Sequence, residues 1–314
     1  MSRALYICHD NPNPSGGIRV LYRHVEELNR AGFKAAVVHF KPDFNPSWFS
    51  HHVPVINISQ KLELFHDDWI VIPEDHTHAI NSFSQVPCRK VIFCQNHFYV
   101  FNSLPREKTW SDFGVSEVMV SSVEILKFVK KVFNLEATLV PVGIDPELFF
   151  PIQEERNPAV AFMPRKGAWA VQTVRGILWH RAPRLRSVKW VPIDGMTEGE
   201  AARTMRQCAV FMATGVLEGF GLPPIEAMAS GCIVVGFTGG GGREYAHDGN
   251  GFWCPDQDPF ILTDRLEDIL TLIMDNPSHP HLASVRQAGF ETARRYSLEA
   301  QRQSLLKFWA PRLS

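Results

Sequence analysis

The sequence predicts an α/β protein built from two open, doubly wound domains that face one another across a cleft. Its 314 residues exceed the usual limit for one hydrophobic core, which favours two domains of roughly 150 residues each. Short apolar runs alternate with amphipathic stretches along the whole chain, as expected for parallel strands joined by crossover helices. A segment dense in proline and charge near the middle separates two such series.

In the first half, residues 5–8 form a predicted strand, and a helix follows over 18–31 with one apolar face. Gly32 ends this helix, since glycine is common just past a helix C-terminus, and a second strand covers 35–38. The remaining strands predicted in this half are 69–72, 90–94 and 117–120.

The second half repeats this alternation. Thr197 and Glu200 form a capping-box start for a helix that runs to Gln207. The strands predicted here are 159–163, 187–191, 210–212 and 233–237. We therefore expect a first domain over 1–147, a linker over 148–157, a second domain over 158–296 and a final helix over 297–314. Ligands of such domains bind at the carboxyl ends of the strands.

Composition narrows the classes of partner. Hydrophobic residues make up 45% of the chain and charged residues 21%, which indicates a globular protein. Lysine and arginine total 32 against 33 acidic residues, so the chain has no overall positive field that would attract nucleic acid. An anionic ligand must therefore be bound by positive groups at a local site. Six cysteines lack C-x-x-C spacing, and three of them lie in apolar runs, which predicts buried, reduced thiols.

The chain begins with an apolar run that soon turns polar, too short for a signal peptide, and no apolar run reaches about 18 residues. We expect a cytoplasmic protein with at most peripheral contact with the inner membrane face. Residues 124–133, after Ser121 and Ser122, read as a capped amphipathic helix with a basic edge. A membrane-surface role is one interpretation of that helix, and core packing is the simpler one.

The segment from Glu218 to Gly231 carries the strongest functional signal. A Gly-Phe-Gly turn precedes a short predicted helix that opens with Pro223 and Pro224, residues suited to a first turn. The N-terminus of such a helix offers backbone N–H groups and the positive end of the helix dipole, which together can seat a diphosphate. Gly221 lets the backbone approach the ligand.

Two carboxylates flank this turn. We expect Glu226 in the first turn of the helix, where it can accept hydrogen bonds from a ribose diol, and Glu218 on the loop where a sugar would lie. The alternative is that Glu226 only complements the helix dipole and that Glu218 is a solvated loop residue.

The motif of two glutamates separated by seven residues, with Gly-Phe-Gly after the first, resembles glycosyltransferase family 4, the large retaining GT-B family of group 1 glycosyl transferases. The resemblance continues through Gly241–Phe252, where the family commonly has Gly-Gly, a Glu and then Asp-Gly-x-x-Gly. Residues 142–149 are similar to the family's Gly-Val-Asp-x-x-x-Phe segment between domains. The family implies two Rossmann-like domains, the first on the acceptor side and the second binding the nucleotide sugar.

The same resemblance implies residue roles. Glu226 would hold the donor ribose, and Glu218 would contact hydroxyls of the donor sugar. The backbone of Phe220, Gly221 and Leu222 would face the diphosphate. The resemblance further implies that the segment from 297 onward crosses back and packs on the first domain.

Arg165 and Lys166 follow the first strand of the second half. They could neutralise a diphosphate leaving group, the arginine through a bidentate fork and the lysine as a point charge. Family members usually place the arginine and the lysine several residues apart, whereas here they are adjacent. The alternative is a solvated pair at the end of a strand.

Two further candidates lie in the first half. Gly16 and Gly17 follow the first strand and resemble the family's Gly-Gly loop against the donor phosphates; a plain turn is the alternative. Asn96 and His97 close another strand, where many family members offer a polar side chain to the donor sugar. The alternative for His97 is a hydrogen-bonded surface histidine. The histidine-rich segments 51–52 and 73–78 lack metal-ligand spacing, so we expect no metal and no cofactor.

These patterns predict a glycosyltransferase of carbohydrate biosynthesis that moves a sugar from a nucleoside diphosphate donor to a sugar, lipid or small-molecule acceptor. The family implies retention of anomeric configuration, with the leaving diphosphate taking the acceptor proton. Two alternatives share the donor seat: a GT-B-like sugar-nucleotide epimerase or hydrolase, and a non-catalytic nucleotide-sugar-binding subunit.

Overall fold

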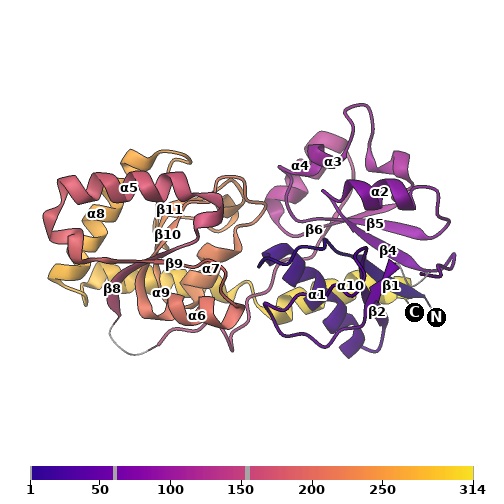
Figure 1. Cartoon of the computed structure of the whole chain (residues 1–314), viewed down its shortest axis with the longest axis horizontal. Coiled ribbons are helices and arrows are strands. Elements are labelled where there is room, and N and C mark those ends of the chain that lie inside the picture. Colours follow the sequence, from indigo (N-terminus) through magenta and orange to yellow (C-terminus); the bar gives the residue numbers. More distant parts are fainter. Residues whose placement is uncertain (1, 59–61, 153–155, 314) are drawn as a thin grey trace. The chain divides into compact units, whose positions relative to one another are not determined.

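The computed structural model describes residues 2–58, 62–152 and 156–313, which divide into two compact units (Figure 1). The first unit holds the residues up to Val142 together with those from Glu299 onward, and the second holds Gly143–Leu298. The segment predicted as a linker, 148–157, falls in the second unit, and its residues 153–155 lie outside the described residues. Each unit is a parallel sheet covered by helices, so the predicted α/β class with two doubly wound domains is confirmed.

In the described part of the chain, the sheet of the first unit has seven strands in the order β3-β2-β1-β4-β5-β6-β7, and neighbouring strands pair in parallel. The strands are β1 (Arg3–Ile7), β2 (Lys34–His39), β3 (Val55–Asn57), β4 (Trp69–Pro73), β5 (Arg89–Cys94), β6 (Glu117–Val120) and β7 (Thr138–Leu139). The chain winds outward from β1 to β3 and then resumes at β4 on the other side of β1. The crevice between the ends of β1 and β4 is therefore the switch point of this sheet.

Helices cover both faces of this sheet. They are α1 (Gly16–Arg30), α2 (Thr77–Phe83), α3 (Val100–Ser103), α4 (Val123–Phe133) and α10 (Leu298–Leu313), with a short 3₁₀ helix at Trp110–Phe113. Figure 1 shows α1 and α10 on one face and α2, α3 and α4 on the other. Ser122 caps α4 as its sequence predicts, its side chain accepting a hydrogen bond from the Ile125 N–H.

Helix α10 packs on the first unit through apolar side chains. Leu305, Phe308 and Trp309 are buried, and Leu298 is half-buried. The indole of Trp309 donates a hydrogen bond to the hydroxyl of Tyr6 on β1 (Nε1 to Oη, 2.9 Å), and both side chains are fully buried. The last helix thus belongs to the core of the unit that contains the first strand.

In the second unit, the described residues form a five-stranded sheet in the order β12-β11-β10-β8-β9, again with parallel neighbours. The strands are β8 (Asn157–Phe162), β9 (Lys189–Pro192), β10 (Cys208–Ala213), β11 (Ile233–Phe237) and β12 (Phe252–Cys254). The chain leaves β8 toward β9 and returns to β10 on the opposite side of β8. The switch point of this sheet lies between the ends of β8 and β10.

The helices of the second unit are α5 (Ala168–Arg181), α6 (Glu198–Gln207), α7 (Leu222–Ala229), α8 (Pro259–Asp275) and α9 (Pro280–Arg294). Figure 1 shows α5 and α8 on one face of the sheet and α6, α7 and α9 on the other. The capping box before α6 is confirmed, because the side chains of Thr197 and Glu200 each accept a hydrogen bond from the other's backbone N–H.

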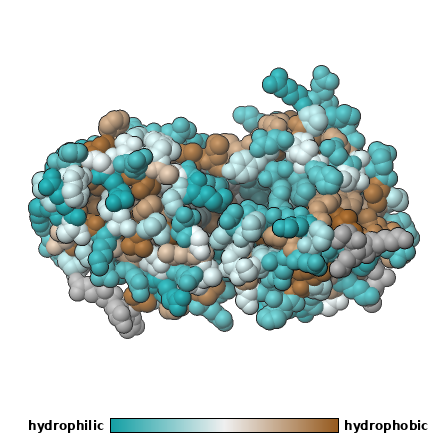
Figure 2. Space-filling view, viewed as in Figure 1, coloured by the Kyte–Doolittle hydropathy of each residue, from teal (hydrophilic) through white to brown (hydrophobic). Residues whose placement is uncertain are grey.

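All six cysteines are buried and free, as the sequence predicts. Within the described residues, none of the helices combines the length and the apolar character needed to cross a membrane. On the face in view in Figure 2, hydrophilic residues cover most of each unit, with smaller hydrophobic groups between them.

One buried histidine makes the first unit sensitive to acid. His24 of α1 is fully buried against the rings of Tyr6 and Phe93, and within the described residues neither ring nitrogen has a hydrogen-bond partner. Burial lowers the pKa of His24 from 6.5 to about 3. The unfolded chain therefore binds more protons than the folded chain between these two values, and stability falls as pH drops through this window.

We predict that His24→Phe loses less stability than the wild type as pH falls from about 7 to 4.5. Phenylalanine binds no proton in either state, so the unfolded chain no longer gains an extra proton at this position. Urea denaturation followed by circular dichroism at each pH measures this. His180→Phe, at an exposed position on α5, should keep the wild-type pH dependence. The same loss in His24→Phe as in the wild type would contradict the prediction.

Candidate functional site

Opposite charges meet at the switch point of the second unit. Lys166 lies in the turn after β8, and Glu218 lies in the loop after β10, the strand next to β8 in the sheet. The Lys166 ammonium donates a hydrogen bond to the Glu218 carboxylate (Nζ to Oε2, 2.8 Å), and both side chains remain partly accessible. An ion pair therefore stands where open parallel sheets bind their ligands.

A glycine lets these two loops approach. A Cβ on Gly167 would lie 2.5 Å from the carbonyl oxygen of Thr214 and would also collide with the hydroxyl of that threonine. Any larger residue would push the turn after β8 away from the end of β10. The missing side chain of Gly167 thus helps to bring Lys166 to Glu218.

Glu218 is held by a second glycine-rich turn. Its N–H donates to the carbonyl of Gly239, and the N–H of Gly241 donates to the carbonyl of Glu218, each at 2.8 Å. A Cβ on Gly239 would lie 2.9 Å from Glu218 Cγ, and a Cβ on Gly215 would lie 2.6 Å from Oε1. The missing side chains of Gly239 and Gly215 therefore leave the room that the Glu218 side chain occupies.

The turn that opens α7 is also fixed. Gly221 is the N-cap residue and has a left-handed backbone (φ +85°), and its carbonyl accepts a hydrogen bond from the hydroxyl of Tyr245 (2.8 Å). Phe220 packs its ring on Tyr245 and Tyr296, so its side chain belongs to the core and only its backbone faces the turn. Leu222, the first helical residue, is half-buried.

The prolines at the start of α7 limit the donors at this helix end. Pro223 and Pro224 have no N–H, so the backbone donors of the first turn come from Leu222 and Ile225, with Gly221 before them. The two prolines fit the first turn as predicted. The positive end of the helix therefore offers fewer backbone donors than an ordinary helix of this length.

The structure corrects the position of Glu226. Because α7 begins at Leu222, Glu226 lies in its second turn and not in the first, and its side chain is buried.

Arg165 lies in the 3₁₀ turn Pro164–Lys166 and is exposed. Of the two predicted cations, the structure therefore brings Lys166, and not Arg165, into contact with Glu218.

The chain holds an Asp-x-Asp triplet, Asp256-Gln257-Asp258, whereas the sequence-based expectation of a metal-free site assumed that none was present. Asp256 accepts hydrogen bonds from the Gly239 N–H (2.9 Å) and the Thr238 hydroxyl (3.3 Å). Asp258 caps α8, because its side chain accepts hydrogen bonds from the N–H groups of Phe260 and Ile261 in the first turn (3.0 Å each). Both carboxylates thus support local structure, Asp256 within the turn that holds Glu218.

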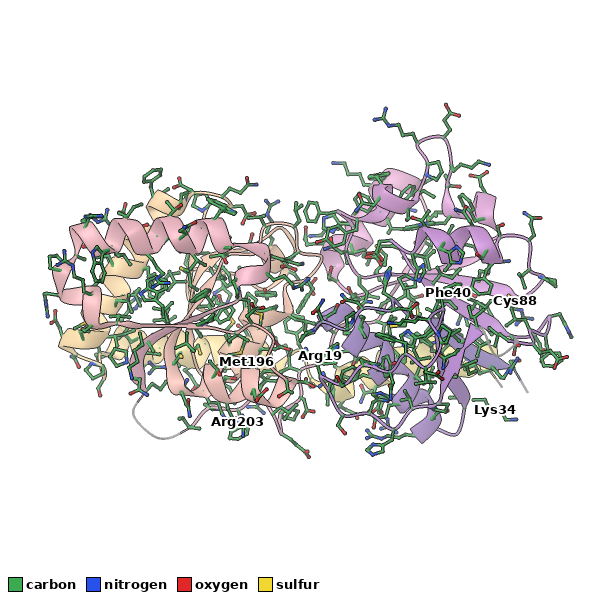
Figure 3. All side chains as sticks on the ribbon, in the orientation of Figure 1. Arg19, Lys34, Phe40, Cys88, Met196 and Arg203 are labelled. Carbon is green, nitrogen blue, oxygen red and sulfur yellow. The ribbon has the colours of Figure 1, made fainter. Side chains whose placement is uncertain are left out.

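In the first unit, a histidine and a carboxylate meet at the switch point between β1 and β4. His9 Nε2 and Asp75 Oδ1 are 2.7 Å apart, and the His9 ring stacks on His76 with 4.4 Å between ring centroids. The hydrogen bond to Asp75 raises the pKa of His9. Phe40, labelled in Figure 3, packs against His76 from the end of β2. Sequence reasoning considered segment 73–78 only as a metal site and missed this pair.

Gly16 and Gly17 form the first turn of α1, which begins at Gly16 and not at Ile18 as predicted. The side chain of Gln95 donates a hydrogen bond to the Gly17 carbonyl (Nε2 to O, 3.2 Å). A Cβ on Gly17 would lie 3.4 Å from that nitrogen. The structure thus brings the predicted Gly-Gly turn next to the segment after β5.

Asn96 and His97 lie in this same segment. Asn96 is buried, and its side-chain oxygen accepts a hydrogen bond from the Phe98 N–H (3.1 Å). His97 is half-buried against the rings of Phe98 and Phe128, and burial lowers its pKa. Its Nδ1 atom has no hydrogen-bond partner among the residues that the structure describes. His97 is therefore neutral at physiological pH.

Comparison with known proteins relates part of the second unit to a family of glycosyltransferases. Residues 193–281 match the family model described as "Glycosyl transferases group 1", and this range includes Glu218, the Gly221 turn and Glu226. An alpha-1,6-glucosyltransferase of Actinobacillus pleuropneumoniae serotype 7 (strain AP76) is 27% identical over 247 residues, which cover 75% of this chain and 72% of the relative.

Solved structures share the fold over the whole chain. Sucrose-phosphate synthase from Thermosynechococcus elongatus aligns with a TM-score of 0.73 at 14% identity, covering 99% of each chain. Anabaena HepE in complex with UDP-glucose aligns with a TM-score of 0.70 at 16% identity, covering 99% of this chain and all of the other. The fold is therefore that of the GT-B glycosyltransferases. The residues that match the model of the group 1 glycosyl transferases lie in the second unit.

We predict that Gly167→Ala destabilises the second unit by about 1–3 kcal/mol, the usual cost of forcing an extra group into a packed site. Gly176→Ala on the adjoining helix α5 is a matched control, because in the described part of the chain no atom beyond its own neighbours and helix backbone lies within 4 Å of the added Cβ. The control should be stabilising by about 0.5–1 kcal/mol, since alanine is a better helix former. Urea unfolding of both variants measures this, and equal stability of Gly167→Ala and wild type would refute the close approach.

Proposed function

We propose that the protein is a retaining glycosyltransferase of family 4 that moves a hexosyl group from a nucleoside diphosphate sugar to an acceptor hydroxyl. The Lys166–Glu218 pair carries the proposal, because it lies at a sheet switch point and its glutamate lies in the segment that matches group 1 glycosyl transferases. The glucosyltransferase relative and the UDP-glucose bound to HepE make UDP-glucose the first donor to test.

Each part of the donor has a proposed partner in the second unit. Glu226 binds the ribose diol, and the backbone at Phe220, Gly221 and Leu222 faces the diphosphate. Glu218 accepts hydrogen bonds from hydroxyls of the donor sugar. In this arrangement the Lys166–Glu218 bond aims the ammonium toward the sugar end of the diphosphate.

Catalysis is electrostatic in this proposal. Arg165, Lys166 and the N-terminus of α7 stabilise the charge that builds on the departing diphosphate, and a single preorganised donor of this kind is typically worth about 3 kcal/mol. The acceptor attacks from the face that the diphosphate leaves, and the diphosphate takes the acceptor proton, so that no protein general base is needed.

The first unit contributes contacts to the donor sugar. We propose that the Gly16–Gly17 turn lies against the phosphates and that Asn96 and His97 contact the sugar. A neutral His97 suits hydrogen bonding to a hydroxyl, because one ring nitrogen donates and the other accepts. The acceptor is a sugar, a lipid or a small molecule.

The two alternatives differ from transfer in their products. An epimerase or hydrolase would consume the donor without an acceptor, and a non-catalytic binding subunit would release no nucleoside diphosphate. A non-catalytic subunit would be expected to have lost Glu218, Glu226 or Arg165, and all three are present. The expected result is acceptor-dependent release of nucleoside diphosphate from a panel that begins with UDP-glucose. Proton NMR of the product should show the donor's anomeric configuration, and an inverted product or hydrolysis alone would overturn the proposal.

We predict that Glu226→Ala weakens binding of a free nucleoside diphosphate by roughly 10- to 100-fold, because a hydrogen bond to a charged group contributes about 1.5–3 kcal/mol. Isothermal titration calorimetry measures the affinity. Glu226→Gln keeps the side-chain volume and should weaken binding less. Glu291→Ala, at an exposed position on α9 of the same unit, should bind like the wild type. Wild-type affinity in a folded Glu226→Ala protein would exclude the ribose contact.

We also predict that transfer does not depend on a divalent ion, since cationic side chains and a helix terminus face the diphosphate in this proposal. The transfer rate is measured with excess EDTA and then after adding magnesium or manganese. The rate should be the same in all three conditions. Loss of transfer with EDTA and recovery with either metal would show that the Asp256–Asp258 triplet or another group holds a metal.

A further inference from the structure

A buried carboxylate in the first unit has no place in the proposed chemistry. Glu74 follows β4, and only 3% of its surface is exposed. Burial and the neighbouring Asp75 carboxylate raise the pKa of Glu74. A carboxyl group in such a place is costly unless hydrogen bonds satisfy it, so its partners indicate what it does.

Both oxygens of Glu74 accept hydrogen bonds from the backbone of the next strand's loop. The N–H of Gln95 donates to Oε2 (3.0 Å), and the N–H of Asn96 donates to Oε1 (2.7 Å). The backbone carbonyl of Glu74 accepts a hydrogen bond from the hydroxyl of Ser103 in α3. The Glu74 carboxyl group therefore fixes the two residues at which the chain leaves β5.

The same loop extends the connection to α1. Gln95, whose N–H is held by Glu74, uses its side chain to donate to the Gly17 carbonyl (3.2 Å). Asn96, also held by Glu74, uses its side-chain oxygen to accept from the Phe98 N–H. One carboxylate thus anchors a path from the end of β4 to the first turn of α1.

We propose that Glu74 is a positioning residue, which holds the Gln95–His97 segment and, through Gln95, the Gly16–Gly17 turn in one geometry for the donor sugar. The ligand in this statement rests on the proposed function, whereas the hydrogen-bonded path stands on the structure alone. Loss of the Glu74 carboxyl group should leave both segments in place but less ordered. The rate of catalysis should fall more than the affinity for a nucleoside diphosphate, because the proposed contacts of the nucleotide lie in the second unit.

Hydrogen exchange of the full-length Glu74→Gln protein tests the path without any need for activity. The amide side chain keeps one acceptor oxygen but turns an NH₂ group toward the other backbone N–H. Exchange of the Gln95 or Asn96 amide should accelerate by about 10- to 100-fold, relative to the change at Val118 and Met119 of β6. Unchanged exchange at residues 95 and 96 would overturn the proposal.

Asp68→Asn is the matched control. Asp68 is also a buried carboxylate and lies at the opposite, amino end of β4, where Arg3 holds it (Nε to Oδ1, 2.9 Å). Its loss perturbs the same strand without touching the 95–97 segment. The control should destabilise the unit and leave the relative exchange at residues 95 and 96 as in the wild type. If both variants accelerate these amides equally, Glu74 has only a general structural role.

Steady-state kinetics supply the second readout. Glu74→Gln should lower kcat about tenfold or more, and the Kd of free nucleoside diphosphate should stay within about twofold of the wild type. Gln95→Leu, which removes only the link to Gly17, keeps the backbone bonds to Glu74 and should also lower kcat. Faster exchange with an unchanged kcat would overturn the positioning role. A wild-type protein without transferase activity would count against the proposed function, and the exchange experiment would still decide the role of Glu74.

Discussion

The candidate site in the second unit depends on the backbone pairing of two turns, the one that holds Glu218 and the one that holds Gly239 and Gly241. Glu218 exchanges hydrogen bonds with Gly239 and Gly241, and a Cβ on Gly241 would lie 2.5 Å from the carbonyl oxygen of Gly219. The turns can approach this closely only because side chains are missing from both. The Glu218 carboxylate pairs with Lys166, and the turn continues directly into Gly221 and α7. The geometry of the proposed donor seat follows from this single contact between backbones.

The sequence predicts most of the fold because long buried strands of a parallel sheet appear as uninterrupted apolar runs. Strands β1, β4, β5 and β10 are of this kind and are buried almost throughout. The edge strands β3, β7 and β12 escaped prediction, since two or three residues make no recognisable run. The start of α1 was misplaced for a different reason. Glycine is a poor helix former, so Gly16 and Gly17 read as a loop, although their neighbours hold them in the first helical turn.

The candidate site was predictable only where its chemistry is local in sequence. The turn Phe220–Leu222 and both flanking glutamates lie within one short segment, whereas Lys166 and Glu218 are 52 residues apart and His9 and Asp75 are 66 apart. Those pairs depend on which strands become neighbours, and strand order is not written in any single motif. Glu74 was missed for the same reason, because its partners Gln95 and Asn96 lie in the loop after β5. Asp256 shows the converse case. Its Asp-x-Asp triplet is local in sequence and visible there, but in the structure Asp256 supports a turn, so the triplet by itself does not indicate a functional site.

In the proposed mechanism Lys166 and Glu218 act as one unit at the reacting centre. A double-mutant cycle of Lys166→Gln and Glu218→Gln on kcat/KM tests this most directly. Each single variant should lower kcat/KM, and the double variant should be less impaired than the product of the two single effects. For residues in contact, such coupling typically amounts to about 0.5–3 kcal/mol. Effects that multiply independently, or single variants that transfer sugar at the wild-type rate, would show that the ion pair at the switch point is not part of the catalytic site.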